Sequence, residues 1–236
     1  MNFIFKRSIQ ACINAYDGEH GKVRGVFEKV IPFQKGHTQG HIGLIGRDLY
    51  IVFEGSDGDL DWKDNFKFWR STTELRKGIL VHKGFEDQFQ TIKDTIMDLI
   101  NRILDNPAQT DKQSIRIICT GHSLGGALAT RMAFHIAYKF PVNPIICVTF
   151  GSPKVGNYAF AKQFNKEIRE SYRFVYGLDT VCGVPPVFFG YWHVDKMIRL
   201  KMPWYDIVLF PIISCTTGMP SDHYPQLYQK EIDRQY

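Results

Sequence analysis

Apolar residues recur along this chain with a helical period in two clear places. Between Phe85 and Ile103 they return every three or four positions, until the Asn-Pro pair at 106–107 interrupts the pattern. Residues 8–16 repeat the same spacing on a shorter scale. The pattern therefore predicts a short helix near the N-terminus and one long amphipathic helix in the middle of the chain.

Other apolar runs are too short for helices and are typical of strands. Residues 41–56 predict two strands around a turn at Gly46 to Asp48. Beyond the long helix, strand and helix patterns alternate: strands over 114–121, 143–153 and 172–179, and helices over 124–140 and 157–171. This alternation predicts an α/β protein with a mostly parallel sheet and helices on its faces.

The chain is predicted to form one domain over residues 1–236. With 236 residues, 44% hydrophobic and 22% charged, it has enough apolar residues for a substantial core. It has no internal repeat, low-complexity tract or Pro/Ser-rich linker. The net charge is +5, but the basic residues are scattered and form no block. Nucleic acid is therefore not an expected partner.

The cysteines and the N-terminal sequence bear on the compartment. The five cysteines, odd in number and without paired spacing, predict buried free thiols: Cys12, Cys119, Cys147, Cys182 and Cys215. The N-terminal residues 1–10 do not have the form of a Sec-type signal peptide, and no apolar run approaches the roughly 20 residues that a transmembrane helix needs. We therefore expect a soluble, cytoplasmic protein, although secretion by another route stays open.

The clearest chemical motif is G-x-S-x-G at 121–125, centred on Ser123. It follows a predicted strand and precedes a predicted helix, which is the context of a nucleophile elbow. The reversal forces the serine into a strained backbone, and glycines on both sides let helix and strand approach closely. The alternative is a serine N-cap at a glycine-rich helix start. The flanking strand and helix favour the nucleophile.

A nucleophilic serine needs a base and a carboxylate that orients it, and in this fold they follow in the order Ser, Asp, His. Asp179 is the expected acid, because it falls just past a predicted strand and is followed by the rigid pair Pro185-Pro186. 

Four of the eight histidines are candidates for the base: His82, His122, His193 and His223. His82 and His122 precede the serine. His193 starts a predicted strand among aromatic neighbours, which favours a structural role. His223, in a polar, proline-flanked loop near the C-terminus, is the expected base.

Several motifs in order resemble the class 3 lipases, whose best-studied members are fungal triacylglycerol lipases. They are LYIVFEGS at 49–56, DW at 61–62, VHKGF at 81–85, TGHSLGGALA at 120–129, TFGSPKVGN at 149–157, LDTVCGVPP at 178–186 and DHY at 222–224. The resemblance implies an α/β-hydrolase fold with Ser123 as nucleophile, Asp179 as acid and His223 as base. It also implies an oxyanion hole from the amide and hydroxyl of Ser56 and the amide of Leu124. No cofactor or metal is implied.

The sequence departs from the family pattern in two places. The family usually has F-R-G-[ST], where this chain has FEGS with Glu54 in place of the arginine, which changes the charges beneath the oxyanion hole. The segment expected to form the lid carries four aspartates, at 57, 59, 61 and 64, and only Leu60 and Trp62 as apolar contacts. Such a lid would gain little from an oil surface. An EF-hand reading of these aspartates fails, because positions 62 and 68 are Trp and Phe.

Residues 201–215 form the most apolar segment between the expected acid and base. One prediction is a core strand with prolines at its edges. The other, which also takes in the aromatics at 187–192, is a wall of the acyl pocket or a loop that touches a membrane. Both readings stay open.

The expected function is a serine carboxylester hydrolase acting on acylglycerols or on short- and medium-chain esters. A phospholipase A1 with the same triad is the first alternative. A non-catalytic protein that binds a lipid or a partner through the same cleft is the second. The complete set of Ser, Asp, His and oxyanion residues argues against the second, and transient contact with a lipid surface is compatible with either enzyme.

Overall fold

A computed structural model describes the chain except for residues 17–24, 56–68, 74–77, 106–113, 142 and 202–220. Within the described residues, seven strands form the central sheet in the order β1-β2-β3-β6-β7-β8-β9. Their bounds are β1 Lys29–Lys35, β2 Thr38–Ile45, β3 Asp48–Phe53, β6 Arg116–His122, β7 Ile145–Phe150, β8 Glu170–Tyr176 and β9 Met197–Leu200. A small second sheet pairs β4 (Arg70–Thr72) with β5 (Leu80–His82).

The sheet is mostly parallel, as expected. β1, β2 and β3 form an antiparallel meander, and from β3 onward each neighbouring pair is parallel. Parallel neighbours need crossover connections, which the helices supply. The carboxyl ends of β3, β6, β7 and β8 therefore lie at one edge of the sheet, where the loops that follow them meet.

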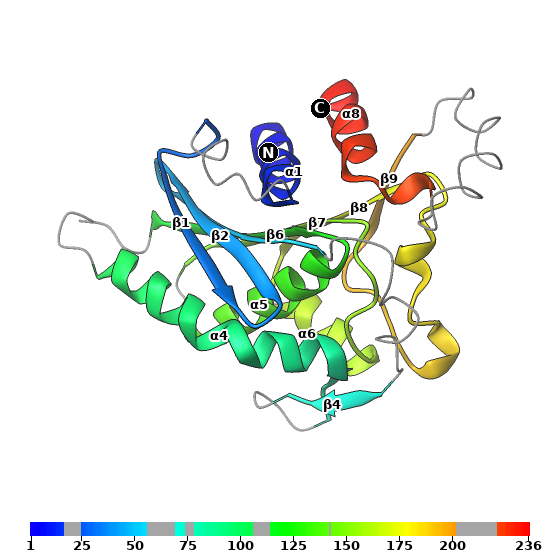
Figure 1. The fold of residues 1–236 in the computed structure, drawn as a ribbon. Helices are drawn as coiled ribbons and strands as arrows, with labels where there is room; N and C mark the ends of the chain where they lie inside the picture. The colour runs from blue at the N-terminus through cyan, green and yellow to red at the C-terminus, as the bar shows by residue number, and fades with distance from the viewer. Residues whose placement is uncertain (17–24, 56–68, 74–77, 106–113, 142, 202–220) are drawn as a thin grey trace.

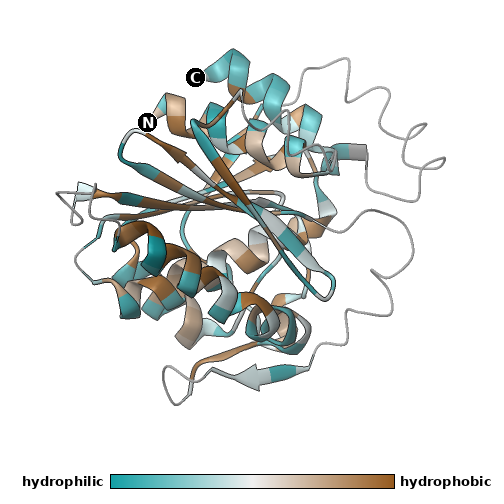
Figure 2. Cartoon of the chain, turned by 60° about the vertical axis from the view of Figure 1, so that its left-hand side comes forward, coloured by the Kyte–Doolittle hydropathy of each residue, from teal (hydrophilic) through white to brown (hydrophobic). Residues whose placement is uncertain are grey.

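Helices cover both faces of the sheet (Figure 1). α1 and α8 lie on one face, and α4, α5 and α6 lie on the other. Their bounds are α1 Asn2–Tyr16, α4 Lys83–Leu104, α5 Leu124–Lys139, α6 Tyr158–Glu167 and α8 Pro225–Gln235. Figure 2 shows hydrophobic residues along the strands and on the helix surfaces that face them. This arrangement confirms the predicted α/β-hydrolase architecture with a sheet between two helical layers.

The helix periods explain how each helix packs. In α4 the buried Phe89, Ile92, Ile96 and Ile100 follow the predicted three- and four-residue spacing, so one stripe faces the core. In α5, by contrast, every residue from Gly125 to Ile136 is buried. α5 contacts β3, β6 and β7 and also α4 and α6, so it is enclosed on several sides.

Several elements differ from the sequence prediction. β4 and β5 were not predicted, and the helix predicted over 157–171 ends at Glu167, so its last residues, Glu170 and Ser171, belong to β8 instead. β1 was not predicted, because Pro32 interrupts its pattern; the strand tolerates proline since it lies at the sheet edge. α8 was not predicted either. The prediction that His193 starts a strand was wrong: β9 begins at Met197, after a turn in which Asp195 has a φ of 52°.

The predicted free thiols are confirmed for the four described cysteines, all of which are buried: Cys12, Cys119, Cys147 and Cys182. Cys119 and Cys147 lie on β6 and β7, as their apolar surroundings predicted. Cys215 and the apolar segment from 202 onward lie outside the described residues, and so does the aspartate-rich segment at 57–64.

Candidate active site

Ser123 occupies the turn between β6 and α5 in a strained conformation. Its φ of 57° and ψ of −128° are values that non-glycine residues rarely adopt. Its amide donates to Phe150 O at 3.0 Å, which ties the turn to β7. The side chain is buried, and its hydroxyl has no hydrogen-bond partner among the described residues. The serine is therefore held by the backbone rather than by side-chain bonds.

Glycines make this turn possible. A Cβ at Gly121 would overlap the backbone of Gly125, and a Cβ at Gly125 would overlap the backbone at the end of β3. A Cβ at Gly126 would come within 2.8 Å of the Ser152 Cβ. The small residues around the serine thus let α5 begin against β3 and β6, as the G-x-S-x-G context predicted.

Asp179 lies three residues beyond β8 and directly before the 3₁₀ helix η2 (Thr180–Gly183). Its Oδ1 accepts a hydrogen bond from the amide of Val181 at 2.9 Å, which caps η2. Its Oδ2 accepts from His223 Nδ1 at 2.8 Å and from the Tyr228 hydroxyl at 2.5 Å. The carboxylate is buried and hydrogen-bonded on both oxygens, which fixes its orientation.

His223 ends the 3₁₀ helix η4 (Ser221–His223), immediately before α8, and is buried. Its ring lies against the ring of His122, with centroids 4.5 Å apart and planes inclined by 34°. Because His122 directly precedes Ser123, this contact brings the expected base beside the expected nucleophile. The structure thus brings Asp179 and His223 into direct contact, with the His223 ring against the residue that precedes Ser123.

Gly151, directly after β7, leaves room for the acid and base. Its φ is 59°, and a Cβ there would come within 2.8 Å of Asp179 Oδ2 and 2.9 Å of the His223 ring. The TFGSP motif thus contributes space where the two side chains meet.

His193 supports the loop after the acid. Its Nε2 donates to the carbonyl of Cys182 at 2.7 Å. Burial, followed by the nearby Arg173 charge, lowers the pKa of His193 to about 3, so the ring is neutral near pH 7. The structural role that the sequence favoured for His193 agrees with this position.

Lys154 supports the loop after the acid, a role that its sequence pattern did not predict, although the residue lies in the TFGSPKVGN motif. Its Nζ donates to the carbonyls of Gly183 at 2.6 Å and Cys182 at 3.4 Å, the last residues of η2. Burial lowers its pKa below the usual value for lysine. Lys154 and His193 together hold the loop that begins with Asp179.

Of the two expected oxyanion donors, Leu124 lies within the described residues and Ser56 does not. Leu124 is the first residue of α5, where amides have no acceptor within the helix and the positive end of the helix dipole lies. Ser56 lies outside the described residues. Just before it, the buried Glu54 accepts a hydrogen bond from Gln39 of β2 at 2.8 Å. The glutamate that replaces the usual arginine is therefore held by a neutral amide.

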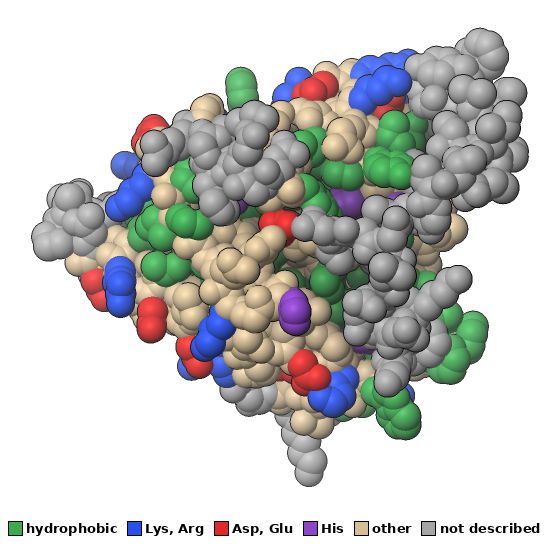
Figure 3. Space-filling view, viewed as in Figure 1, with side chains coloured by type: hydrophobic (Ala, Val, Ile, Leu, Met, Phe, Trp, Pro, Cys, Tyr) green, Lys and Arg blue, Asp and Glu red, His purple; other side chains and the backbone are tan. Residues whose placement is uncertain are grey.

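Exposed aromatic and aliphatic side chains project near this edge of the sheet. Phe188 is 83% exposed and Trp69 is 70% exposed. Others belong to segments that follow β7 and β8: Tyr158, Leu178, Val187, Phe189 and Trp192. In Figure 3 green side chains project at the lower right, the side on which η3 (Val187–Phe189) and β4 lie in Figure 1. We call these seven residues the apolar rim.

The described residues contain no group of three or more His, Cys, Asp or Glu side chains that could hold a metal ion. Across the same part of the chain, no helix combines the length and apolar character needed to cross a membrane.

The fold is that of an α/β hydrolase. Residues 50–189, well over half of the chain, match the model of the lipase (class 3) family, and the chain belongs to that family. The match includes Ser123 and Asp179 but ends before His223.

Two known proteins are similar to this chain in sequence. A secreted mono- and diacylglycerol lipase of Fusarium solani is 33% identical over 150 residues, which are 63% of this chain and 43% of that protein. A chloroplastic phospholipase A(1) of Arabidopsis thaliana is 30% identical over 158 residues, covering 60% of this chain and 34% of that protein. The chain therefore spans less than half of the length of either relative.

Solved structures share the fold. Lipase II from Rhizopus niveus superimposes with a TM-score of 0.75 and 24% identity, covering 85% of this chain and 81% of that chain.

Proposed function

We propose that this chain is a carboxylester hydrolase that cleaves acyl esters through an acyl-serine intermediate. Ser123 is the nucleophile, His223 the base and Asp179 the acid that orients it. The observation that carries the proposal is the buried Asp179–His223 hydrogen bond beside a serine held at a φ of 57°. A buried acid and base next to a strained serine are the parts that serine hydrolysis requires.

The reaction would proceed in two halves. His223 accepts the Ser123 proton as the hydroxyl oxygen attacks the ester carbonyl, and then gives this proton to the departing alkoxide. Water next attacks the acyl-serine with the same help from His223 and releases the acid. Asp179 stabilises the imidazolium that forms in each half. The Leu124 amide and Ser56 would donate to the oxyanion, and losing one such donor costs about 3–4 kcal/mol in other hydrolases.

A serine-directed fluorophosphonate tests the nucleophile. We expect wild type to hydrolyse p-nitrophenyl butyrate and to take one label, and Ser123→Ala to lose both label and turnover by about 10⁴-fold or more. Labelling that persists in Ser123→Ala would contradict the assignment.

The base is tested by a matched pair of histidine variants. We expect His223→Ala to reduce turnover about as strongly as Ser123→Ala, because base and nucleophile act as a unit. His193→Gln should retain most turnover, because the His193 ring only donates to the Cys182 carbonyl and a glutamine amide can do the same. Near-normal kcat in His223→Ala, with loss in a folded His193→Gln, would reverse the choice.

The relatives support acylglycerols or phospholipids as the substrate class, and a side-by-side panel of both decides between lipase and phospholipase A1 activity. Within this class we propose a preference for short or medium acyl chains presented in solution. The aspartate-rich segment at 57–64 supports this choice, because hydrated carboxylates oppose docking on oil.

The apolar rim argues against this preference, because its exposed side chains could bind a lipid surface. The test is therefore the rate of hydrolysis measured at tributyrin concentrations below and above its solubility limit. A smooth saturating curve is expected for the wild type and for Phe188→Asp. A sharp rise on emulsion formation that Phe188→Asp abolishes would overturn the proposed preference.

A further inference from the structure

The two terminal helices pack side by side on the same face of the sheet (Figure 1). Asn2 Nδ2 on α1 donates to the Tyr236 carbonyl at 2.9 Å, and Gln229 Nε2 on α8 donates to Gln10 Oε1 at 2.6 Å. Both helices lie outside the residues that match the family model. They carry two tyrosines that reach the candidate active site from this face.

Tyr228 of α8 contacts the acid. Its hydroxyl donates to Asp179 Oδ2, the same oxygen that accepts from His223 Nδ1. The tyrosine is fully buried, and burial, followed by the neighbouring Cys182 and Asp179, raises its pKa well above 10. It therefore remains a proton donor at any pH of interest. Two donors share one carboxylate oxygen, so each neutralises part of the charge that the other sees.

Tyr16, the last residue of α1, acts on the other side of the base. Its hydroxyl lies 2.8 Å from His122 Nδ1, and the His122 ring lies against His223. Burial, then the neighbouring His223, lowers the pKa of His122 well below 6.5, so His122 stays neutral when His223 takes a proton. The Tyr16 hydroxyl also fills the space where a Cβ of Gly55 would lie, directly before Ser56.

We propose that Tyr228 and Tyr16 are positioning residues for the base: Tyr228 moderates the charge of Asp179, and Tyr16 fixes the ring on which His223 rests. The proposal rests on the proposed function. Among the described residues, the titratable and charged groups around His223 and its acid are Asp179 after β8, His122 at the end of β6, Asp222 of η4, the Tyr228 hydroxyl from α8, the Cys182 thiol of η2 and, near Tyr228 and Cys182, Arg173 of β8. On the β7 side lies Gly151, which has no side chain.

Tyr228→Phe removes one donor and leaves more negative charge on Asp179 for the imidazolium. In the plot of kcat/KM for p-nitrophenyl butyrate against pH, we expect the acidic limb to shift to higher pH by about 0.5–1 unit. We also expect kcat to fall about 10-fold with little change in KM. Tyr16→Phe should lower kcat about threefold to 10-fold and leave the limb in place, since His122 remains neutral.

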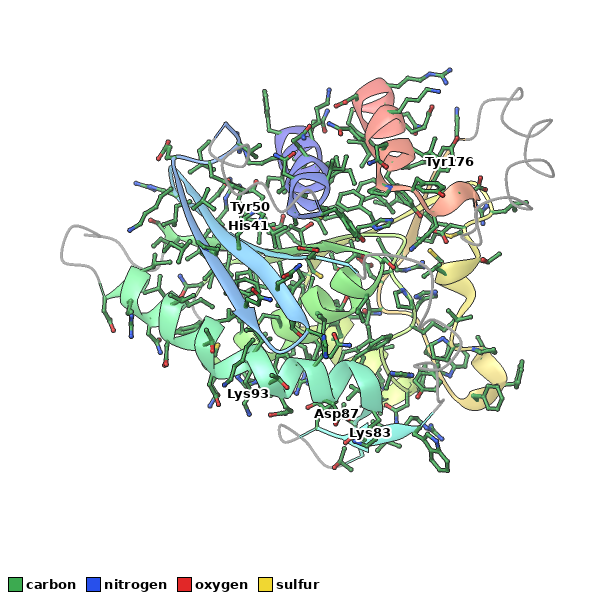
Figure 4. All side chains as sticks on the ribbon, viewed as in Figure 1. His41, Tyr50, Lys83, Asp87, Lys93 and Tyr176 are labelled. Atoms are coloured by element: carbon green, nitrogen blue, oxygen red, sulfur yellow. The ribbon has the colours of Figure 1, made fainter. Side chains whose placement is uncertain are left out.

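Tyr50→Phe is the matched control. Tyr50 is a fully buried tyrosine of β3 on the face that α1 covers (Figure 4), and it loses the same atom without touching Asp179 or His122. Its kcat and pH profile should equal those of the wild type.

If the acidic limb of the kcat/KM profile is unchanged in Tyr228→Phe, the role of Tyr228 is overturned, even if the melting temperature falls. If kcat of Tyr16→Phe is within twofold of wild type, the role of Tyr16 is overturned.

If Tyr228→Phe does not fold, 3-fluorotyrosine placed at 228 makes the hydroxyl a stronger donor, and the acidic limb should then move to lower pH. NMR titration of the His223 imidazole in wild type and Tyr228→Phe reads the same effect without turnover. It therefore separates failure of this proposal from failure of the proposed function.

Discussion

Two buried polar pairs lie on opposite faces of the sheet and have different consequences. Arg131 of α5 bonds Glu86 of α4 through Nε at 2.7 Å and Nη2 at 3.0 Å. Gln90 donates to the same carboxylate at 2.7 Å, and the guanidinium lies 3.9 Å from the centre of the Phe89 ring. On the other face, Asp179 bonds His223 and Tyr228. Both arrangements are buried and hydrogen-bonded.

The difference lies in the neighbours of each pair. The Glu86–Arg131 pair joins two helices, and its neighbours include the Gln90 amide and the Phe89 ring. The Asp179–His223 pair lies beside a serine with a strained backbone, whose hydroxyl has no partner among the described residues. Burial and pairing alone therefore do not distinguish the two pairs; the strained backbone of Ser123 near the second pair does, and it supports the proposed catalytic role.

The largest effect on stability is expected from breaking the pair between helices. Glu86→Ala leaves the Arg131 charge buried without its partner, so the free energy of unfolding should fall by about 3–5 kcal/mol. Urea denaturation measures this loss, and the rate per folded molecule should stay within twofold of wild type. Restoring an apolar interior with Glu86→Leu and Arg131→Met together should recover most of the stability. A loss below about 1 kcal/mol in Glu86→Ala would show that water reaches the arginine.

A smaller effect concerns the loop after Asp179 and depends on pH. Because the folded pKa of His193 is about 3, below the unfolded value near 6.5, protons bind preferentially to the unfolded chain. The free energy of unfolding should therefore fall as pH drops from 6.5 toward 3, and His193 accounts for about 2 kcal/mol of the fall at pH 5. His122 acts in the same direction.

His193→Gln tests this contribution, since the amide can donate to Cys182 without titrating. Its unfolding free energy should fall less between pH 7 and pH 5 than that of wild type, by about 2 kcal/mol. Equal falls in both proteins would place the acid sensitivity elsewhere.

The smallest effect is expected from a partly exposed pair at the amino ends of β3 and β6, of which Asp48 is buried and Arg116 reaches solvent. Arg116 bonds Asp48 through two contacts, at 2.6 and 2.8 Å, but its side chain is 44% exposed. Arg116→Ala should therefore cost less than about 1 kcal/mol, and high salt should reduce the difference. A larger loss that persists in high salt would show that geometry outweighs exposure for this pair.

Local patterns were enough to predict the parts of the fold and site that depend on neighbouring residues. The spacing from Phe85 to Ile103 predicted α4, and the glycines around Ser123 predicted the turn, because both features are written in adjacent residues. The choice of Asp179 followed from its place after a strand.

Features that depend on distant segments could not be predicted in this way. Nothing next to Tyr228 in sequence indicates that its hydroxyl reaches Asp179, which is 49 residues away. The same holds for Tyr16 and His122, which are separated by 106 residues. The position of Lys154 under η2 also required the fold, although its motif gave a signal. The strand over Lys29–Lys35 was hidden by Pro32, which only an edge position tolerates.

Gly151 limits how the specificity of this protein can be redesigned. Any other residue there would need an unfavourable φ and would push into Asp179 and His223, so libraries that vary this position should yield mostly inactive variants. Leu178, Val187 and Phe188 project into solvent from nearby segments. If the proposed function holds, substitutions at these three positions would change the exposed surface near the loop after Asp179 while leaving the acid and base in place, so they are the first positions to vary in a selection for new esters.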